Sequence, residues 1–253
     1  MLIQEQDDDS DKRLHKTTQL THQIYIDIQK IKQFLYLAFL IQLIFNLSVV
    51  FLTETGHTNF YGFKKFYFDD EESVPTYFSA INLLFTGILL AIITNFKSKL
   101  NDPFTRQWKL LSVIFVILSI DEIAGFHEMI IDPMVRNFNF SAYLRFPWVI
   151  LGVIFMIGFS LYYLNFLKAL PKKHIKGFFY SCLIFVSGAI GIETISAKIF
   201  ISREESAKDL MYNLVTTAEE SCEMIGIIMF ITVLLSYLKS MKSEITFSFK
   251  QSE

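Results

Sequence analysis

Six long apolar stretches dominate this chain of 253 residues and limit what it can fold into. An α-helix needs about 20 mostly apolar residues to cross the hydrocarbon core of a bilayer. Stretches of that length run over 33–52, 77–96, 110–131, 147–169, 177–199 and 212–238. Hydrophobic residues make up 52% of the chain, and the mean hydropathy is +0.40. We therefore predict an all-α protein, an integral membrane bundle of six transmembrane helices.

The basic residues predict how the bundle is oriented. Sixteen of the 23 Lys and Arg residues fall in the two tails and in the second and fourth loops. Because cytoplasmic segments are enriched in Lys and Arg, both termini should be cytoplasmic, in a multi-pass protein of the cell (inner) membrane. Residues 1–32 form the predicted N-terminal tail, 33–238 the transmembrane domain and 239–253 the C-terminal tail. Apolar residues at helical spacing from Leu20 to Leu35 predict an amphipathic helix on the membrane surface, and the alternation of Ile24, Ile26 and Ile28 leaves a strand as the alternative. No cleavable signal is expected.

Three of the stretches carry acids in positions that lipid does not tolerate. A charged residue at the centre of a spanning helix costs about 2.5 to 3.5 kcal/mol, so seven acids facing lipid would oppose insertion by roughly 20 kcal/mol. They should therefore face one another, water or a bound cation. The seven are Asp121, Glu122, Glu128, Glu193, Glu219, Glu220 and Glu223.

Depth along the predicted helices places these acids in one layer. A helix rises about 1.5 Å per residue, and the hydrocarbon core is about 30 Å thick. Counted from the cytoplasmic edge, all seven fall in the outer half of the bilayer. Asp121 and Glu128 are seven residues apart on one predicted helix and should share a face, with His127 beside it. Four polar residues on other helices should support the site: Asn46, Ser79, Asn82 and Ser196.

An excess of negative charge points to a bound cation. The seven acids have only His127 and Lys198 as nearby counter-charges, so either several acids are protonated or a divalent ion neutralises them. A metal accounts for His127 better than protons do. The predicted ligands are Asp121, His127, Glu128, Glu193, Glu219 and Glu223. This oxygen-rich set favours Ca²⁺, Mg²⁺, Mn²⁺ or iron over a sulfur-bound Zn²⁺ site.

The predicted outer loop from Thr53 to Pro75 is first aromatic and then acidic, ending in the run Asp69, Asp70, Glu71 and Glu72. Interfacial aromatic rings and a solvated acidic face are the default interpretation. The functional alternative is a vestibule that collects cations.

Three segments together resemble a pattern found in an uncharacterised group of bacterial multi-pass membrane proteins. They are Ser119-Ile120-Asp121-Glu122 with His127-Glu128, Gly188 to Glu193, and Glu219-Glu220-Ser221-Cys222-Glu223-Met224-Ile225-Gly226. The resemblance covers about the C-terminal 60% of the chain. That group has no established activity, so the resemblance implies a shared site without naming its chemistry.

The leading functional hypothesis is a metal-dependent enzyme, a hydrolase or an oxidoreductase, acting on a lipid or other apolar substrate. The metal would activate water or oxygen, and Glu122 or Glu220 would act as general base. A cation channel or transporter that uses the same acids is the first alternative, and a non-catalytic sensor or subunit is the second. Membrane lipids are the expected partners. Nucleic-acid binding is not expected, because no basic stripe alternates with stacking aromatic residues.

Overall fold

Three of the long helices begin at side chains that cap their first turns. In the computed structural model, which describes residues 27–57, 62–129, 147–202 and 209–241, the capping residues are Asp27, Ser73 and Asp209. Each side-chain oxygen accepts a hydrogen bond from a backbone N–H of the first turn that has no partner within the helix. The helices that they start are α1 (Ile28–Glu54), α2 (Val74–Lys99) and α9 (Leu210–Ser240).

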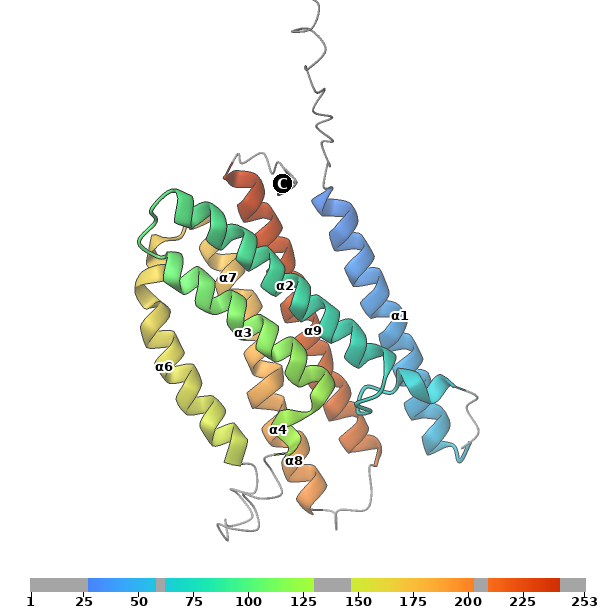
Figure 1. Cartoon of the computed structure of the whole chain (residues 1–253). Helices are drawn as coiled ribbons and strands as arrows, with labels where there is room; N and C mark the ends of the chain where they lie inside the picture. The colour runs from blue at the N-terminus through green and yellow to red at the C-terminus, as the bar shows by residue number, and fades with distance from the viewer. Residues whose placement is uncertain (1–26, 58–61, 130–146, 203–208, 242–253) are drawn as a thin grey trace, which may run out of the picture.

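Every secondary-structure element in the described part of the chain is helical, which confirms the predicted all-α class. Helix α9 packs against α1, α2 and α7, and so forms the axis of the bundle (Figure 1). Helix α3 pairs along its length with α2. The remaining elements are η2 (Phe63–Phe66, 3-10 helix), α3 (Thr105–Ala124), α4 (Phe126–Met129), α6 (Pro147–Ala169), α7 (Lys172–Val186), η4 (Ser187–Ile192, π-helix) and α8 (Glu193–Ser202).

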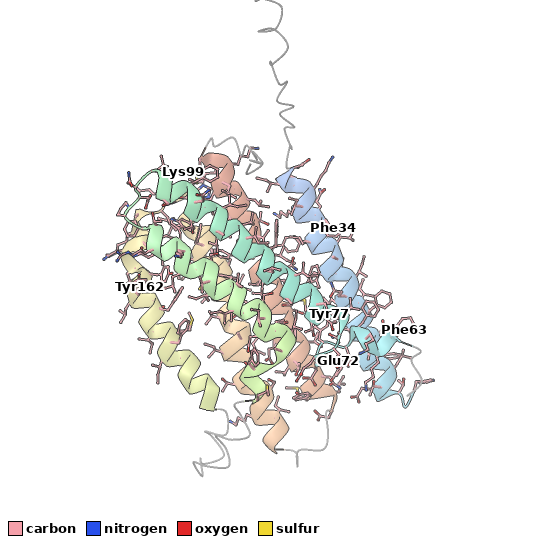
Figure 2. All side chains as sticks on the ribbon, in the orientation of Figure 1. Phe34, Phe63, Glu72, Tyr77, Lys99 and Tyr162 are labelled. Carbon is pink, nitrogen blue, oxygen red and sulfur yellow. The ribbon has the colours of Figure 1, made fainter. Side chains whose placement is uncertain are left out.

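Five helical segments are long and apolar enough to cross a membrane, which supports a multi-pass membrane protein. They cover 28–54, 74–99, 152–169, 172–196 and 210–240. Helix α3 is not among them, because Lys109, Asp121 and Glu122 lie within its 20 residues. Apolar and aromatic side chains such as Phe34 and Tyr162 project away from the bundle, as a lipid-facing surface requires (Figure 2).

The predicted third helix, 110–131, is wrong in its extent. Helix α3 ends at Ala124, because Gly125 adopts the left-handed conformation (φ 59°) and its N–H closes the helix onto the carbonyl of Asp121 at 2.7 Å. The short α4 then begins at Phe126. Asp121 and Glu128 therefore do not lie on one face of a continuous helix, and the alignment predicted for them is incorrect.

The other helices agree with the sequence to different degrees. Helix α6 has the bounds of the fourth predicted stretch, 147–169. The fifth stretch, 177–199, is instead three consecutive elements, of which the middle one, η4, is π-helical. Of the amphipathic helix predicted from Leu20 to Leu35, residues 20–26 lie outside the described residues, while 28–35 are the start of α1, and the C-terminal tail falls mainly on 242–253, also outside the described residues. Both assignments remain predictions.

Small residues bring α2 and α3 into close contact. The Ser112 hydroxyl donates to the carbonyl of Gly87 at 2.8 Å, and the Ser119 hydroxyl donates to the carbonyl of Ala80 at the same distance. A methyl group at Gly87 would lie 2.9 Å from Cγ2 of Val116. Because lipid tails are as apolar as side chains, helices in a membrane associate through such close packing and hydrogen bonds.

An aromatic cluster fills the end of the bundle where α2 passes into α3. Trp108 is 1% exposed, and its ring centroid lies 4.8 Å from that of Phe166 and 5.2 Å from that of Tyr237. Phe178 approaches Trp108 edge-on at 5.9 Å. These four rings come from α3, α6, α7 and α9 and so hold four helices together at one point.

Replacing Trp108 with Ala should therefore lower the free energy of unfolding by about 3 to 5 kcal/mol. The substitution leaves a cavity between four helices, which cannot all move to fill it. Denaturation of the purified protein in detergent would measure the change. Phe34→Ala, at a side chain that is 67% exposed on α1, is the control and should change little. Equal effects of the two substitutions would contradict the role given to the aromatic cluster.

Candidate functional site

Helix α9 carries three acids within two turns, and the first of them is firmly held. Glu219 is 8% exposed, and its Oε2 accepts a hydrogen bond of 2.7 Å from the hydroxyl of Ser196 on α8. Ser196 was predicted to support the site. The contact fixes α8 against α9 at the level of the acids.

Acids from three other segments surround Glu220 and Glu223 at distances where their charges interact. Glu223 interacts with Glu122 at the end of α3 and with Glu193 at the start of α8. Glu220 interacts with Glu122 as well, and with Asp69 from the loop before α2. We call this group the carboxylate cluster: Asp69, Glu122, Glu193, Glu219, Glu220 and Glu223.

Glu220 and Glu223 differ from the other members in their partners. Both side chains are half-buried, and among the described residues neither carboxylate has a hydrogen-bond or ion-pair partner. Like charges gathered in a medium of low dielectric constant repel strongly. The arrangement therefore suits a bound cation, or protons retained by some of the acids.

A π-helix leads directly into the cluster. Element η4 ends at Ile192, one residue before Glu193, and its Gly188 lies against α9. A methyl group at Gly188 would lie 2.8 Å from both the carbonyl oxygen of Glu219 and Cγ of Glu223. The wider turn of a π-helix shifts the residues after it relative to a regular α-helix, and such segments are frequent at functional sites. Here it sets the direction from which Glu193 meets α9.

The other predicted supporting residues differ in their contacts. Asn46 is fully buried, and its side-chain nitrogen donates to the Thr217 hydroxyl of α9 at 2.8 Å. Ser79 and Asn82 are also buried, on α2. In the described part of the chain no hydrogen bond joins either of them to the carboxylate cluster.

The predicted ligands of the third stretch are placed differently from one another. His127 and Glu128 lie on α4, beyond the break at Gly125, and their side chains are outside the described residues. Asp121 is half-buried near the end of α3. Its neighbour Glu122, predicted as a general base, is the α3 acid that interacts with Glu220 and Glu223.

The described residues contain no group of three or more His, Cys, Asp or Glu side chains arranged to hold a metal ion. Since His127 and Glu128 fall outside the residues searched, the predicted ligand set remains a prediction. Asp69 was not predicted as part of the site. Its only signal in the sequence was the acidic run that follows the aromatic residues of the outer loop.

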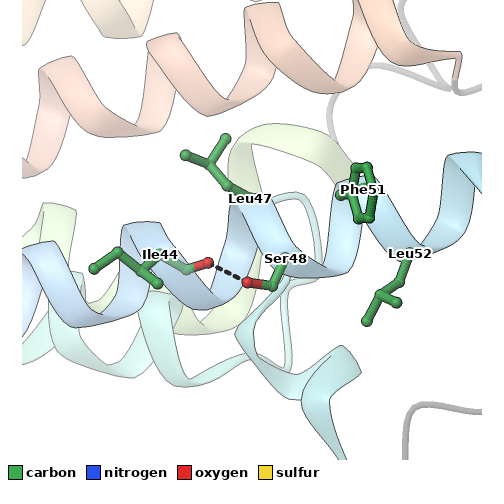
Figure 3. A pocket seen from close by; sticks show the side chains of 5 residues that line it. All are labelled: Ile44, Leu47, Ser48, Phe51 and Leu52. Carbon is green, nitrogen blue, oxygen red and sulfur yellow. Dashed lines mark hydrogen bonds between the residues drawn. The ribbon is translucent and has the colours of Figure 1, made fainter.

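A separate apolar groove lies on the surface of α1. It is lined by Ile44, Leu47, Ser48, Phe51 and Leu52 (Figure 3). The Ser48 hydroxyl donates to the carbonyl of Ile44 at 2.8 Å, so the one polar side chain of the groove is engaged with its own helix. This surface suits contact with lipid chains and plays no part in the carboxylate cluster.

The core between the carboxylate cluster and the aromatic cluster is apolar along α9. Tyr237 follows Glu223 by 14 residues, a rise of about 21 Å. The fully buried side chains between them on α9 are Met224, Ile228, Ile231 and Leu234. The acids of α9 thus lie in its N-terminal half, and apolar side chains fill the core beyond them.

The close approach of η4 to α9 can be tested with paired glycine substitutions. Gly188→Ala should destabilise the protein by about 1 to 3 kcal/mol, because its methyl group overlaps the Glu219 carbonyl and the Glu223 side chain. Gly191→Ala, three residues later in η4 with nothing within 4 Å, is the matched control and should change stability by less than about 1 kcal/mol. Melting curves in detergent would compare them. Indistinguishable curves would argue against this contact.

Comparison with known proteins gives a family but no activity. No curated protein and no solved structure matches the chain. The motif pattern and the bacterial origin suggested by the sequence remain predictions. A family model described as a domain of unknown function (DUF8692) matches residues 35–238, which include three of the five spanning segments in full, most of the first and last, and the whole carboxylate cluster, and the chain belongs to this family.

Proposed function

We propose that this protein binds a cation at the carboxylate cluster, in the outer half of a six-helix membrane bundle with both termini cytoplasmic. Helix α3 is the sixth span. Its 20 residues rise about 30 Å, the thickness of the hydrocarbon core. The start of α1 and the end of α9 lie at the same end of the bundle, as an even number of spans requires (Figure 1).

The proposal rests on the surroundings of the Glu220 and Glu223 carboxylates. Neither has a hydrogen-bond or ion-pair partner among the described residues, and each interacts with at least three other acids. Acids at membrane depth are expensive and mark ion or substrate sites. A divalent cation shared by the cluster would convert their mutual repulsion into attraction.

We assign the cation to a divalent metal that serves a reaction on a lipid or another apolar substrate. Its ligands would be Glu193, Glu219 and Glu223 of the carboxylate cluster together with Asp121 of α3 and His127 and Glu128 of α4. A metal of this kind, when bound, lowers the pKa of water and so supplies a nucleophile. Glu122 or Glu220 would accept the proton of that water.

The apolar and aromatic packing below the cluster favours an enzyme over a channel. A permeation path needs polar groups or water across the whole membrane. The buried side chains of α9 beyond Glu223 are apolar as far as the aromatic cluster. A site accessible from one side suits a substrate that enters from the outer leaflet or from the outside solution.

A second candidate is a transporter that exchanges cations or protons at the same acids. It is favoured by the interactions of Glu220 and Glu223 with one another and with Glu122. Neighbouring carboxylates that share a proton need no metal.

The orientation predicts which surface residues a membrane-impermeant thiol reagent reaches. In a background with Cys182→Ala and Cys222→Ala, Glu72→Cys in the exposed outer loop should be labelled on intact cells. Ser98→Cys, at the opposite end of α2, should be labelled only after the membrane is opened. The reverse pattern would overturn the orientation and place the cluster near the cytoplasm.

Bound metal is the direct test of the site. Wild-type protein should carry a divalent metal in elemental analysis, and added metal at about 100-fold over its Kd should stabilise it by about 2.7 kcal/mol. Glu223→Gln and His127→Ala should lose the metal and melt earlier than wild type. Glu72→Gln, whose side chain is 85% exposed, is the control and should retain the metal.

The opposite result would select the second candidate. A neutral amide keeps most hydrogen bonds of a protonated acid, so Glu223→Gln would then be as stable as wild type. Metal-free wild-type protein together with a stable Glu223→Gln variant would reject the metal site and leave the proton-exchange hypothesis.

A further inference from the structure

The loop before α2 turns back into the bundle instead of remaining in solvent. Phe68 is 4% exposed and belongs to the hydrophobic core. Its backbone N–H donates to Oδ1 of the buried Asn46 at 2.9 Å, while the nitrogen of the same side chain binds Thr217 of α9. One amide thus ties the loop to both α1 and α9.

Two tyrosine hydroxyls fasten the same loop to the first turn of α9. The Tyr67 hydroxyl donates to Oδ1 of Asn213 at 2.6 Å, and the Tyr212 hydroxyl donates to Oδ1 of Asp69 at 3.1 Å. Burial, and then the charge of Asp69, raise the pKa of Tyr67 well above its ordinary value. The Tyr67 hydroxyl therefore keeps the proton that it donates. Asp69, held in this way, interacts with Glu220.

The far end of the loop reaches α3. The carboxyl group of Glu71 lies beside Gly125, with Oε2 3.3 Å from where a Cβ of residue 125 would be. The Thr76 hydroxyl donates to the carbonyl of Asp70 at 3.1 Å and joins the loop to the first turn of α2. Residues 67–71 therefore run from α1 and α9 to the end of α3, the helix whose Glu122 interacts with Glu220.

We infer that residues 67–71 form a strap across the outer mouth of the carboxylate cluster, and that release of this strap controls access to Glu220 and Glu223. Asp69 is the member of the carboxylate cluster that the strap itself carries. The inference rests on the proposed function only for the identity of what enters. The strap itself is defined by its contacts with Asn46, Asn213, Tyr212 and Gly125.

Access can be measured without knowing the natural ligand. A water-soluble carbodiimide activates a carboxyl group, and an added amine then displaces the urea and leaves an amide that peptide mass spectrometry locates. Tyr212→Phe keeps the ring and removes the hydrogen bond to Asp69. It should speed labelling of Glu220 and Glu223 by about two- to tenfold, the shift in an opening equilibrium that the loss of one hydrogen bond produces.

A reversible cross-link that holds the strap in place tests the same opening. In the Cys182→Ala, Cys222→Ala background, Tyr67→Cys with Asn213→Cys can be joined by a short bis-thiosulfonate reagent that reduction removes. Joined protein should label more slowly than the same protein after reduction. Tyr162→Phe, on the lipid-facing side of α6, is the control for Tyr212→Phe and should label at the wild-type rate.

Unchanged labelling of Glu220 and Glu223 both in Tyr212→Phe and on joining the strap would overturn the inference. Metal content, measured on the same samples, reports separately on the proposed function. A strap that controls labelling in a metal-free protein would uphold the inference and reject the metal site. Protein that carries metal, but whose labelling does not change when the strap is released or joined, would support the metal site and reject the inference.

Discussion

A carboxylate that leaves water for the interior of a membrane protein loses hydration worth several kcal/mol, so its surroundings have to compensate for each acid of α9. Glu219 receives the Ser196 hydroxyl. Glu220 and Glu223 receive no comparable partner among the described residues and instead interact with acids of three other segments. A fold that only needed stability would place apolar residues here. We therefore associate the function of the protein with these acids.

The two halves of α9 show how the bundle tolerates this cost. Rings from α3, α6, α7 and α9 interlock around Trp108 at one end and hold the helices largely through shape and dispersion. Apolar side chains continue from there to Glu223. The packing that stabilises the bundle thus lies away from the acids. The part of the bundle around the acids can therefore hold side chains that serve chemistry and not packing.

Irregular backbone gathers around the carboxylate cluster. The left-handed Gly125 ends α3, the π-helix η4 precedes Glu193, and residues 67–71 cross between helices. At membrane depth, non-helical backbone persists only where protein buries it or where it borders a water-filled space. Each irregularity also redirects an acid or a neighbour of an acid: Glu122 lies just before Gly125, Glu193 follows η4, and Asp69 lies on the strap. The backbone departures and the acids form one structural unit.

Local sequence by itself determined the all-helical class and the multi-pass character, because hydropathy and run length act on each segment separately. It predicted α6 at 147–169 and selected the acids of α9. It could not place the break at Gly125, since a glycine inside an apolar stretch is compatible with a continuing helix, nor the wide turn of η4. Only the tertiary structure decided that Glu122 of α3 interacts with Glu220 and Glu223 of α9, and that Asp69 joins the cluster. Asp69 and its partner Tyr212 are 143 residues apart, and such a pairing depends on how the helices pack, which no local pattern encodes.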